Sequence, residues 1–163
     1  MPFVGTMLFE SEPNRECWHE AGHALVAHHL GMTVLATGFS WVRGERHEPN
    51  PSSWIPTDGF DKDSVAIELF GGVAAETLKL GDYDAMAHGS DVRAWRDLRC
   101  SSSSDHYIQQ AIGILKERDA GLVRVYNRLM QERAHPSYPR FQDTEDHIWK
   151  QRHLTQEDFE ALM

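Results

Sequence analysis

A long apolar segment that carries two histidines and a glutamate constrains the fold of this chain more than any other feature. Residues 17–30 are apolar on several faces of a helix, which predicts a helix that is buried on most sides. Within it lies His19-Glu20-Ala21-Gly22-His23, an H-E-x-x-H motif. Histidines four residues apart lie one above the other on a helix, so both imidazoles can reach one metal ion. Buried polar groups need partners, and a shared metal is the simplest partner for these.

The expected helix also has recognisable ends. Ser11 is a suitable N-cap, and Glu12 and Pro13 fall in the first turn, where an acid favours the helix dipole and a proline loses no hydrogen bond. Gly31 is a natural stop. We therefore predict a helix over about residues 12–30.

Three further potential ligands in this segment are assigned to ordinary structure. His28 and His29 are interpreted as helix-end residues. Cys17 points about 160° around the helix from His19 and is interpreted as a small core residue.

The motif supplies two ligands and a base for zinc chemistry. A catalytic zinc site has three protein ligands and an open position for water, and the metal lowers the pKa of that water toward ~7. Glu20, next to His19, is placed to accept the proton. The third ligand has to come from another part of the chain.

A second helix is predicted over residues 61–80, with Asp61 or Asp63 at its start and Gly81 at its stop. Gly71-Gly72 lies in its middle. Each glycine costs about 1 kcal/mol relative to alanine there, so we expect the pair to allow close approach of a neighbouring helix. The helix with the two histidines is the natural neighbour.

Two carboxylates are candidates for the third ligand. Ser90 can cap a short helix whose first turn carries Asp91, and Asp91 is the predicted ligand. Glu76 is the alternative, although a role in orienting a histidine N–H suits it better.

Three motifs in order, HEAGHALVAHHLG, LFGGVAAETL and GSDVRAW, resemble the proteolytic domain of the FtsH-type ATP-dependent zinc metalloproteases. The resemblance spans roughly residues 15–98, and residues 154–158 are similar to the start of the family's terminal helix. It implies one zinc ion per chain, Glu20 as general base, and three ligands: His19, His23 and Asp91. It also implies a strand edge beside the zinc that binds an extended peptide.

The family's membrane anchor and AAA ATPase module have no counterpart in this sequence. It has no run of about 18 apolar residues, no signal peptide and no G-x-x-x-x-G-K-[ST] loop. We expect a single, free-standing FtsH-like peptidase domain over residues 1–163. Its substrates should then be unfolded or flexible polypeptides. They are cut unaided or delivered by a separate ATPase or unfoldase. The domain could also form a homo-oligomer.

Composition indicates the location of the protein and argues against some classes of partner. Two cysteines are too few for a disulfide framework, which indicates reduced thiols and a cytoplasmic location. The formal net charge of −9 without a basic stripe argues against a nucleic-acid partner or an anionic membrane surface.

The remaining segments indicate a small sheet and further helices. Residues 33–42 predict one or two strands beside the metal, and residues 43–56 predict a loop. Trp54 and Ile55 in that loop either line a substrate cleft or cover the core.

The C-terminal third predicts mainly helix. Ser104 can cap a helix that Gly121 breaks in two, and residues 135–152 predict an irregular segment or short helix. Thr155 begins a capping box with Asp158. Four histidines are interpreted as solvated: His106, His135, His147 and His153.

Together these patterns predict an α+β, predominantly α-helical domain of zincin-like type, with four or five helices and one small β-sheet beside the metal site. The leading hypothesis for function is a zinc-dependent metallopeptidase. The alternative is a weak or inactive metal-binding module that recognises polypeptides or regulates an assembly. A purely structural zinc is disfavoured because structural sites usually have four ligands rich in cysteine.

Overall fold

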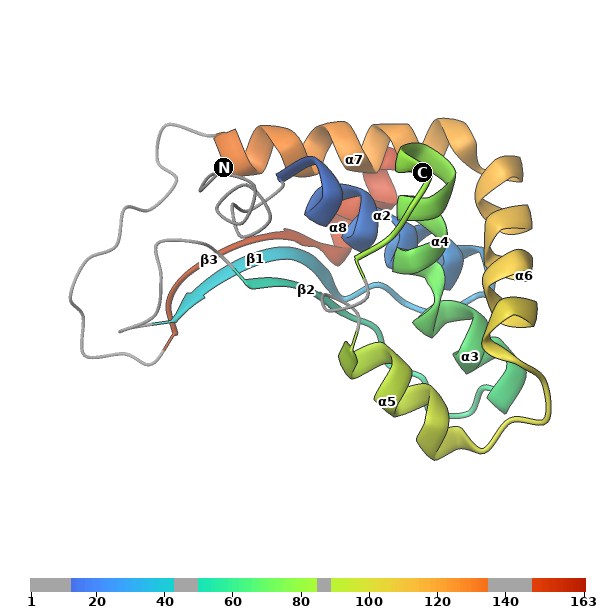
Figure 1. The fold of residues 1–163 in the computed structure, drawn as a ribbon. Coiled ribbons are helices and arrows are strands. Elements are labelled where there is room, and N and C mark those ends of the chain that lie inside the picture. The colour runs from blue at the N-terminus through green and yellow to red at the C-terminus, as the bar shows by residue number, and fades with distance from the viewer. Residues whose placement is uncertain (1–12, 43–49, 85–88, 135–147) are drawn as a thin grey trace, which may run out of the picture.

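The computed structural model describes residues 13–42, 50–84, 89–134 and 148–163 (Figure 1). This part of the chain forms seven helices and one three-stranded antiparallel sheet, so the α+β, predominantly helical class is confirmed, with more helices than expected. The helices are α2 (Pro13–His29), α3 (Lys62–Leu69), α4 (Gly71–Leu80), α5 (Gly89–Leu98), α6 (Ser104–Glu117), α7 (Asp119–Ala134) and α8 (Gln156–Leu162). The strands are β1 (Ala36–Val42), β2 (Asn50–Trp54) and β3 (Ile148–Thr155).

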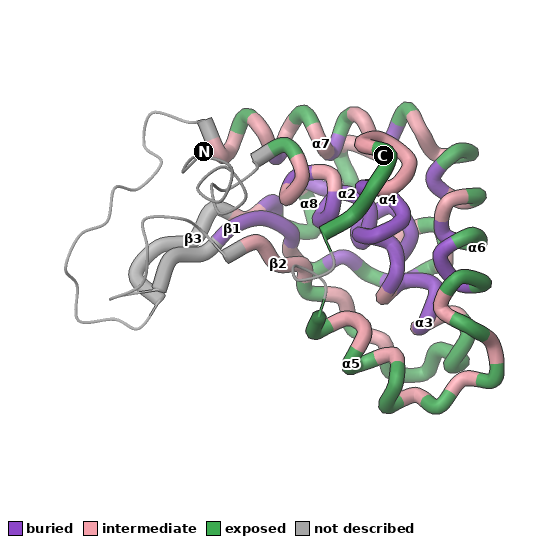
Figure 2. Tube along the Cα trace, in the orientation of Figure 1, coloured by how far each residue is buried: buried purple, intermediate pink, exposed green. Residues whose placement is uncertain are grey.

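Helix α2 is the central element, as its apolar sequence predicts. It packs against α4, α6 and α7 and against β1 and β2, and most of it is buried (Figure 2). Gly31 ends it with a left-handed φ of 83°, the Gly31 N–H donates to the His28 carbonyl, and the Met32 N–H donates to the Ala27 carbonyl at 2.9 Å. This is the Schellman pattern expected of a glycine stop. The predicted cap at Ser11 and start at Glu12 lie outside the described residues.

The single helix predicted over residues 61–80 is wrong, because the chain forms two helices there. Phe70 separates α3 from α4 with φ −92° and ψ 5°, just before two glycines, which have a low helix propensity. The predicted ends are confirmed: the Asp61 side chain accepts a hydrogen bond from the Ser64 N–H at 2.8 Å, and Gly81 takes a left-handed φ of 83°.

Glycines allow α2 and α4 to touch backbone to backbone, as the sequence predicts. A Cβ atom on Gly22 would lie 2.2 Å from the Gly71 carbonyl oxygen, and one on Gly71 would lie 2.9 Å from the Gly22 oxygen. Backbone atoms cannot move aside as a flexible side chain can, so the separation of the two helices depends on both glycines.

We expect Gly22→Ala to lower the free energy of unfolding by about 1–3 kcal/mol or more, because the added methyl group meets the backbone of α4. Gly113→Ala is the matched control, since Gly113 lies in α6 and its added Cβ meets nothing within 4 Å. That substitution should raise the free energy of unfolding by about 0.5–1 kcal/mol. Urea denaturation measures both, and an equal effect of the two substitutions would contradict the close approach.

The sheet corrects two further predictions. Its order is β2-β1-β3, with both neighbours antiparallel to β1. Strand β2 lies within residues 43–56, predicted as a loop, and β3 begins within residues 135–152, predicted as irregular or helical. Strand β2 is polar and contains Pro51, which edge strands tolerate, so its sequence has no apolar alternation to reveal it. The predicted capping box is confirmed: Thr155 and Asp158 bond reciprocally at the start of α8.

The C-terminal helices begin and break close to the predicted positions but not at them. The N-cap of α6 is Ser103 rather than Ser104. The break falls at Arg118 rather than Gly121, and Gly121 lies inside α7, where an added Cβ would be 3.1 Å from the Leu25 side chain. Gly121 thus serves packing against α2 and not termination.

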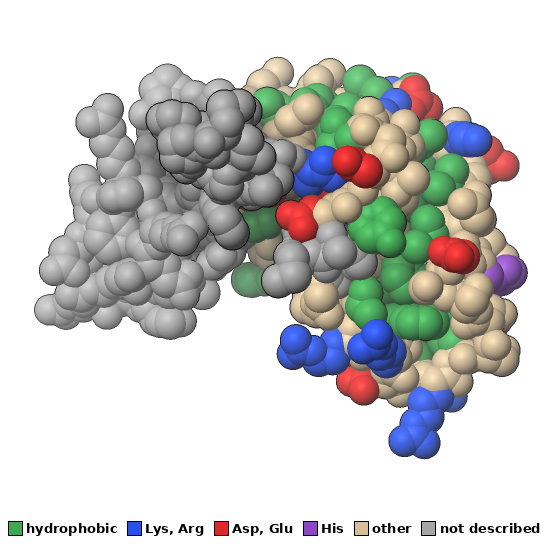
Figure 3. All heavy atoms as spheres, viewed as in Figure 1, with side chains coloured by type: hydrophobic (Ala, Val, Ile, Leu, Met, Phe, Trp, Pro, Cys, Tyr) green, Lys and Arg blue, Asp and Glu red, His purple; other side chains and the backbone are tan. Residues whose placement is uncertain are grey.

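Charges of both signs are interspersed on the face seen in Figure 3, and Lys and Arg side chains lie both along its upper part and at its lower end, where Figure 1 places α5. Arg93 and Arg96 of α5 are exposed, as is Arg99 just after it. Among the described residues, no helix has both the length and the apolar character needed to cross a membrane.

Candidate metal centre

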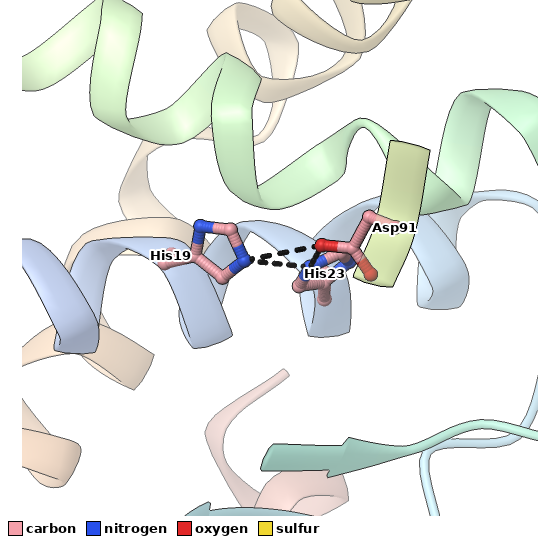
Figure 4. Close-up of side chains that lie close together, drawn as sticks. All are labelled: His19, His23 and Asp91. Carbon is pink, nitrogen blue, oxygen red and sulfur yellow. Dashed lines mark hydrogen bonds and ion pairs between the residues drawn. The ribbon is translucent and has the colours of Figure 1, made fainter. Parts of the chain in front are cut away.

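The structure brings three of the predicted site residues together. His19 and His23 project from α2, and Asp91 reaches them from the first turn of α5 (Figure 4). The two Nε2 atoms lie 3.0 Å apart, and Asp91 Oδ2 lies 3.4 Å from His19 Nε2 and 3.2 Å from His23 Nε2. Helix α5 is held by its packing on α3 and by the edge-on contact of Trp95 with Phe70, the residue that follows α3.

These distances fit a single metal ion. A tetrahedral ion bonded at about 2.0–2.1 Å separates its ligand atoms by about 3.3–3.4 Å. The triangle of Nε2, Nε2 and Oδ2 has nearly these dimensions, and two imidazoles with one carboxylate suit a transition metal such as zinc. His19, His23 and Asp91 could therefore hold one metal ion.

Hydrogen bonds on the far side of each ring set the tautomers that a metal needs. His23 Nδ1 lies 3.0 Å from the Glu68 carbonyl oxygen, which can only accept, so this nitrogen carries a hydrogen and donates it. It also lies 3.1 Å from Glu68 Oε1. His19 Nδ1 lies 2.9 Å from Glu76 Oε1 and donates in the same way. In the neutral histidines both Nε2 lone pairs consequently face Asp91.

Glu76, the alternative ligand, lies on the other side of His19 from the cluster. Besides its bond with His19, it accepts from Arg15 Nη1 at 3.0 Å and from the Asp84 N–H at 2.9 Å. Its side chain is 1% exposed. The structure thus gives Glu76 the contact that orients a histidine N–H.

Glu68 is a member of the site that sequence reasoning does not single out. It is the only acid in the apolar run of residues 65–70, and this isolation is the signal that could have identified it. Arg15 and Ser53 were not expected either, and Ser53 carries no distinguishing sequence signal because it lies in the polar strand β2.

Glu20 lies next to the cluster and is held by the sheet. It is 4% exposed, and its Oε2 accepts a hydrogen bond from Ser53 Oγ at 2.5 Å. Ser53 Oγ is in turn 2.7 Å from Thr37 Oγ1, its register partner on β1. The small sheet therefore lies beside the histidines, and its strand β2 contacts the predicted base.

Gly72 leaves the space that the His19 ring occupies. A Cβ atom on Gly72 would lie 2.5 Å from His19 Nε2 and Cε1. Only glycine leaves room at this point of α4 for the imidazole to reach Asp91.

The site concentrates negative charge. Four carboxylates surround the two rings: Glu20, Glu68 and Glu76 are at most 5% exposed, and Asp91 is partly buried. Arg15 supplies one positive charge. Unpaired buried charges are unfavourable, so the arrangement favours a cation among the donor atoms.

In the metal-free protein, protons bound to the histidines compensate this negative charge. Burial by itself lowers the pKa of His19, but hydrogen bonds with Asp91 and Glu76 outweigh burial and raise this pKa to about 8. Burial opposes charge on His23 too, yet the Asp91 and Glu68 carboxylates raise its pKa well above the usual range. Burial favours neutral Asp91, but the two histidines hold the pKa of its carboxyl well below the usual value.

We expect the metal-free protein to lose stability as the pH rises above about 6.5. A histidine whose pKa increases from 6.5 unfolded to about 8 folded stabilises the fold fully below pH 6.5, and this contribution disappears as the pH rises through 8. Metal ions compete with the same protons, so zinc affinity should increase over this interval. Urea unfolding with chelator and with zinc, between about pH 6 and 9, measures both trends. Metal-free stability that increases across this interval would contradict the expectation.

Other candidate ligands lie away from the cluster. Cys17 is fully buried, and burial raises the pKa of its thiol to about 12, which fits the predicted core residue. His28 accepts a hydrogen bond from Arg118 Nη2 at 2.9 Å, and His29 is exposed, as expected at a helix end.

The outer histidines and Trp54 give mixed outcomes. His106 is exposed as predicted, whereas His153 is only partly exposed, because its ring lies 3.3 Å from Ser52 Oγ and packs on Trp54. His135 and His147 lie outside the described residues. Trp54 is 52% exposed, so it does not cover the core. Ile55 is partly buried and packs against the core.

Comparison of the sequence with protein-family models and with curated proteins finds no match.

Proposed function

We propose that the protein is a zinc-dependent metallopeptidase that hydrolyses peptide bonds of unfolded or flexible polypeptides. One observation carries the proposal: a glutamate adjacent to a cluster of two histidines and an aspartate is held against the strand at the edge of a sheet. Three protein donors leave a fourth tetrahedral position free, which is the arrangement of catalytic rather than structural zinc.

A zinc ion held by His19, His23 and Asp91 would supply a Lewis acid and lower the pKa of the nucleophilic water. The Glu20 carboxylate would accept a proton from the attacking water and pass it to the leaving amine. Ser53 engages one oxygen of Glu20 and leaves the other to accept the proton. The bonds from Nδ1 to Glu68 and Glu76 keep both rings in the orientation that binding requires.

Strand β2 suits an extended substrate. Among the described strands it pairs with β1 on one side only, so its other edge can bind a peptide by backbone hydrogen bonds. A peptide added there lies beside Glu20, because Ser53 of the same strand contacts this residue. Only a segment without stable structure of its own can extend along such an edge.

The resemblance of the three motifs to FtsH-type proteases supports the same proposal. Helix α4, with the G-G-x-A-A-E sequence of the second motif, packs against the helix that carries the first. We extend the proposal to a cytoplasmic location and to a separate ATPase or unfoldase that supplies substrates.

Metal analysis and a cleavage assay on the purified chain test the proposal together. We expect about one zinc per chain, cleavage of an intrinsically unfolded protein, loss of cleavage with a chelator, and recovery when zinc is returned. A chain that holds zinc but cleaves no unfolded polypeptide, alone or with an unfoldase, would instead support the metal-binding module.

A further inference from the structure

The two histidines of the cluster are each held by a glutamate, but the two glutamates differ in charge environment. Glu76 binds His19 and also accepts from Arg15 and from the Asp84 N–H. Its negative charge is therefore shared among three donors, one of which is a guanidinium.

Glu68 has no such compensation. It is 5% exposed, and among the described residues its carboxylate has no lysine or arginine within ion-pair distance. Its charge is directed at His23 Nδ1, 3.1 Å from Oε1. The backbone carbonyl of Glu68 accepts from the same nitrogen at 3.0 Å, so one residue holds the ring through two oxygens.

The break between α3 and α4 makes this double contact possible. Glu68 lies in the last turn of α3, where a carbonyl lacks its usual partner four residues further along the helix, and its oxygen only shares the Phe70 N–H with the Ala66 carbonyl. A carbonyl oxygen has two lone pairs, so this one can also accept from a side chain of α2. This arrangement arises only because the chain turns at Phe70.

We propose that Glu68 is the positioning residue that sets the metal affinity of the cluster, acting through His23, and that Glu76 contributes less. A carboxylate bonded to Nδ1–H increases the electron density at Nε2, and the effect grows with the uncompensated charge of the carboxylate in a buried site. The Arg15 guanidinium weakens this effect for Glu76. The inference rests on the metal-binding part of the proposed function and is independent of peptide cleavage.

Zinc dissociation constants, measured by competition with a chromogenic chelator, test the inference in the parent chain, Glu68→Gln and Glu76→Gln. Glutamine keeps the size of the side chain and an oxygen that accepts from Nδ1–H, and removes the charge. We expect Glu68→Gln to weaken zinc binding about 10- to 100-fold and Glu76→Gln to weaken it less than about tenfold. Equal losses, or a larger loss for Glu76→Gln, would overturn the inference.

Glu68→Asp keeps the charge and the backbone carbonyl and so provides a second, conservative variant. Its zinc affinity should lie between those of the parent and Glu68→Gln. If Glu68→Gln does not fold by circular dichroism, Glu68→Asp is compared with Glu76→Asp, and an equal or larger loss of affinity for Glu76→Asp would overturn the inference. The visible spectrum of the cobalt-substituted chain should shift in Glu68→Gln more than in Glu76→Gln, which a merely structural role would not produce.

The same measurements separate this inference from the peptidase proposal. A parent chain that binds zinc tightly, loses affinity in Glu68→Gln and cleaves nothing supports the role of Glu68 and contradicts the peptidase. A parent chain that binds no divalent metal overturns both.

Discussion

Glu20→Gln is expected to reduce hydrolysis of an unfolded polypeptide to about one per cent of the parent rate or less. Glutamine has nearly the same shape and still accepts a hydrogen bond from Ser53 Oγ, but it cannot take a proton from water. General-base steps contribute typically about 10²- to 10⁴-fold, so this single change removes most of the rate. Initial rates with a fluorogenic unfolded substrate and zinc in excess measure the effect.

Zinc content and fold are the internal controls for this variant. Glu20 is not among the three donors of the cluster, so Glu20→Gln should bind as much zinc as the parent and have the same circular dichroism spectrum. Ser52→Ala is a matched surface control, since the Ser52 hydroxyl contacts His153 rather than Glu20. If the Glu20→Gln protein were as active as the parent, Glu20 would not be the general base, and the alternative of a weak or inactive metal-binding module would be favoured.

His23→Ala is expected to abolish zinc binding, with occupancy near zero after dialysis against trace metal. It removes one of the two nitrogens that lie 3.0 Å apart, and two remaining donors bind zinc far more weakly than three. In the parent, zinc at about 1,000 times its dissociation constant should stabilise the fold by about 4 kcal/mol. For a chain of this size that raises Tm by about 8–16 °C. His23→Ala should lose this increase.

Asp91→Ala and Glu76→Ala distinguish the two candidate third ligands. Asp91 Oδ2 lies within 3.4 Å of both Nε2 atoms, so Asp91→Ala should lose the zinc-dependent increase in Tm and most of the bound metal. Glu76 contacts His19 through Nδ1, so Glu76→Ala should retain metal. The reverse pattern would make Glu76 the ligand and Asp91 its supporting residue.

Local features of this chain were readable from the sequence because each depends on a few neighbouring residues. The spacing of His19 and His23 places both on one face of a helix whatever surrounds it. Gly31 and Gly81 end helices by their own left-handed backbone, and the capping box at Thr155 is complete within four residues. The paired glycines at 71 and 72 predicted a close contact with a neighbouring helix.

The tertiary structure alone decided which distant groups meet. Strand β2 is polar and gains its conformation from pairing with β1, so no periodicity within it distinguishes it from a loop. Asp91 could be named as a candidate, but only the packing of α5 on α3 brings it to the histidines. Glu68 becomes part of the site because the chain turns at Phe70, where sequence periodicity predicted continuous helix. Helix propensity and capping act over a few residues, whereas burial and charge pairing act between segments that are far apart in the chain.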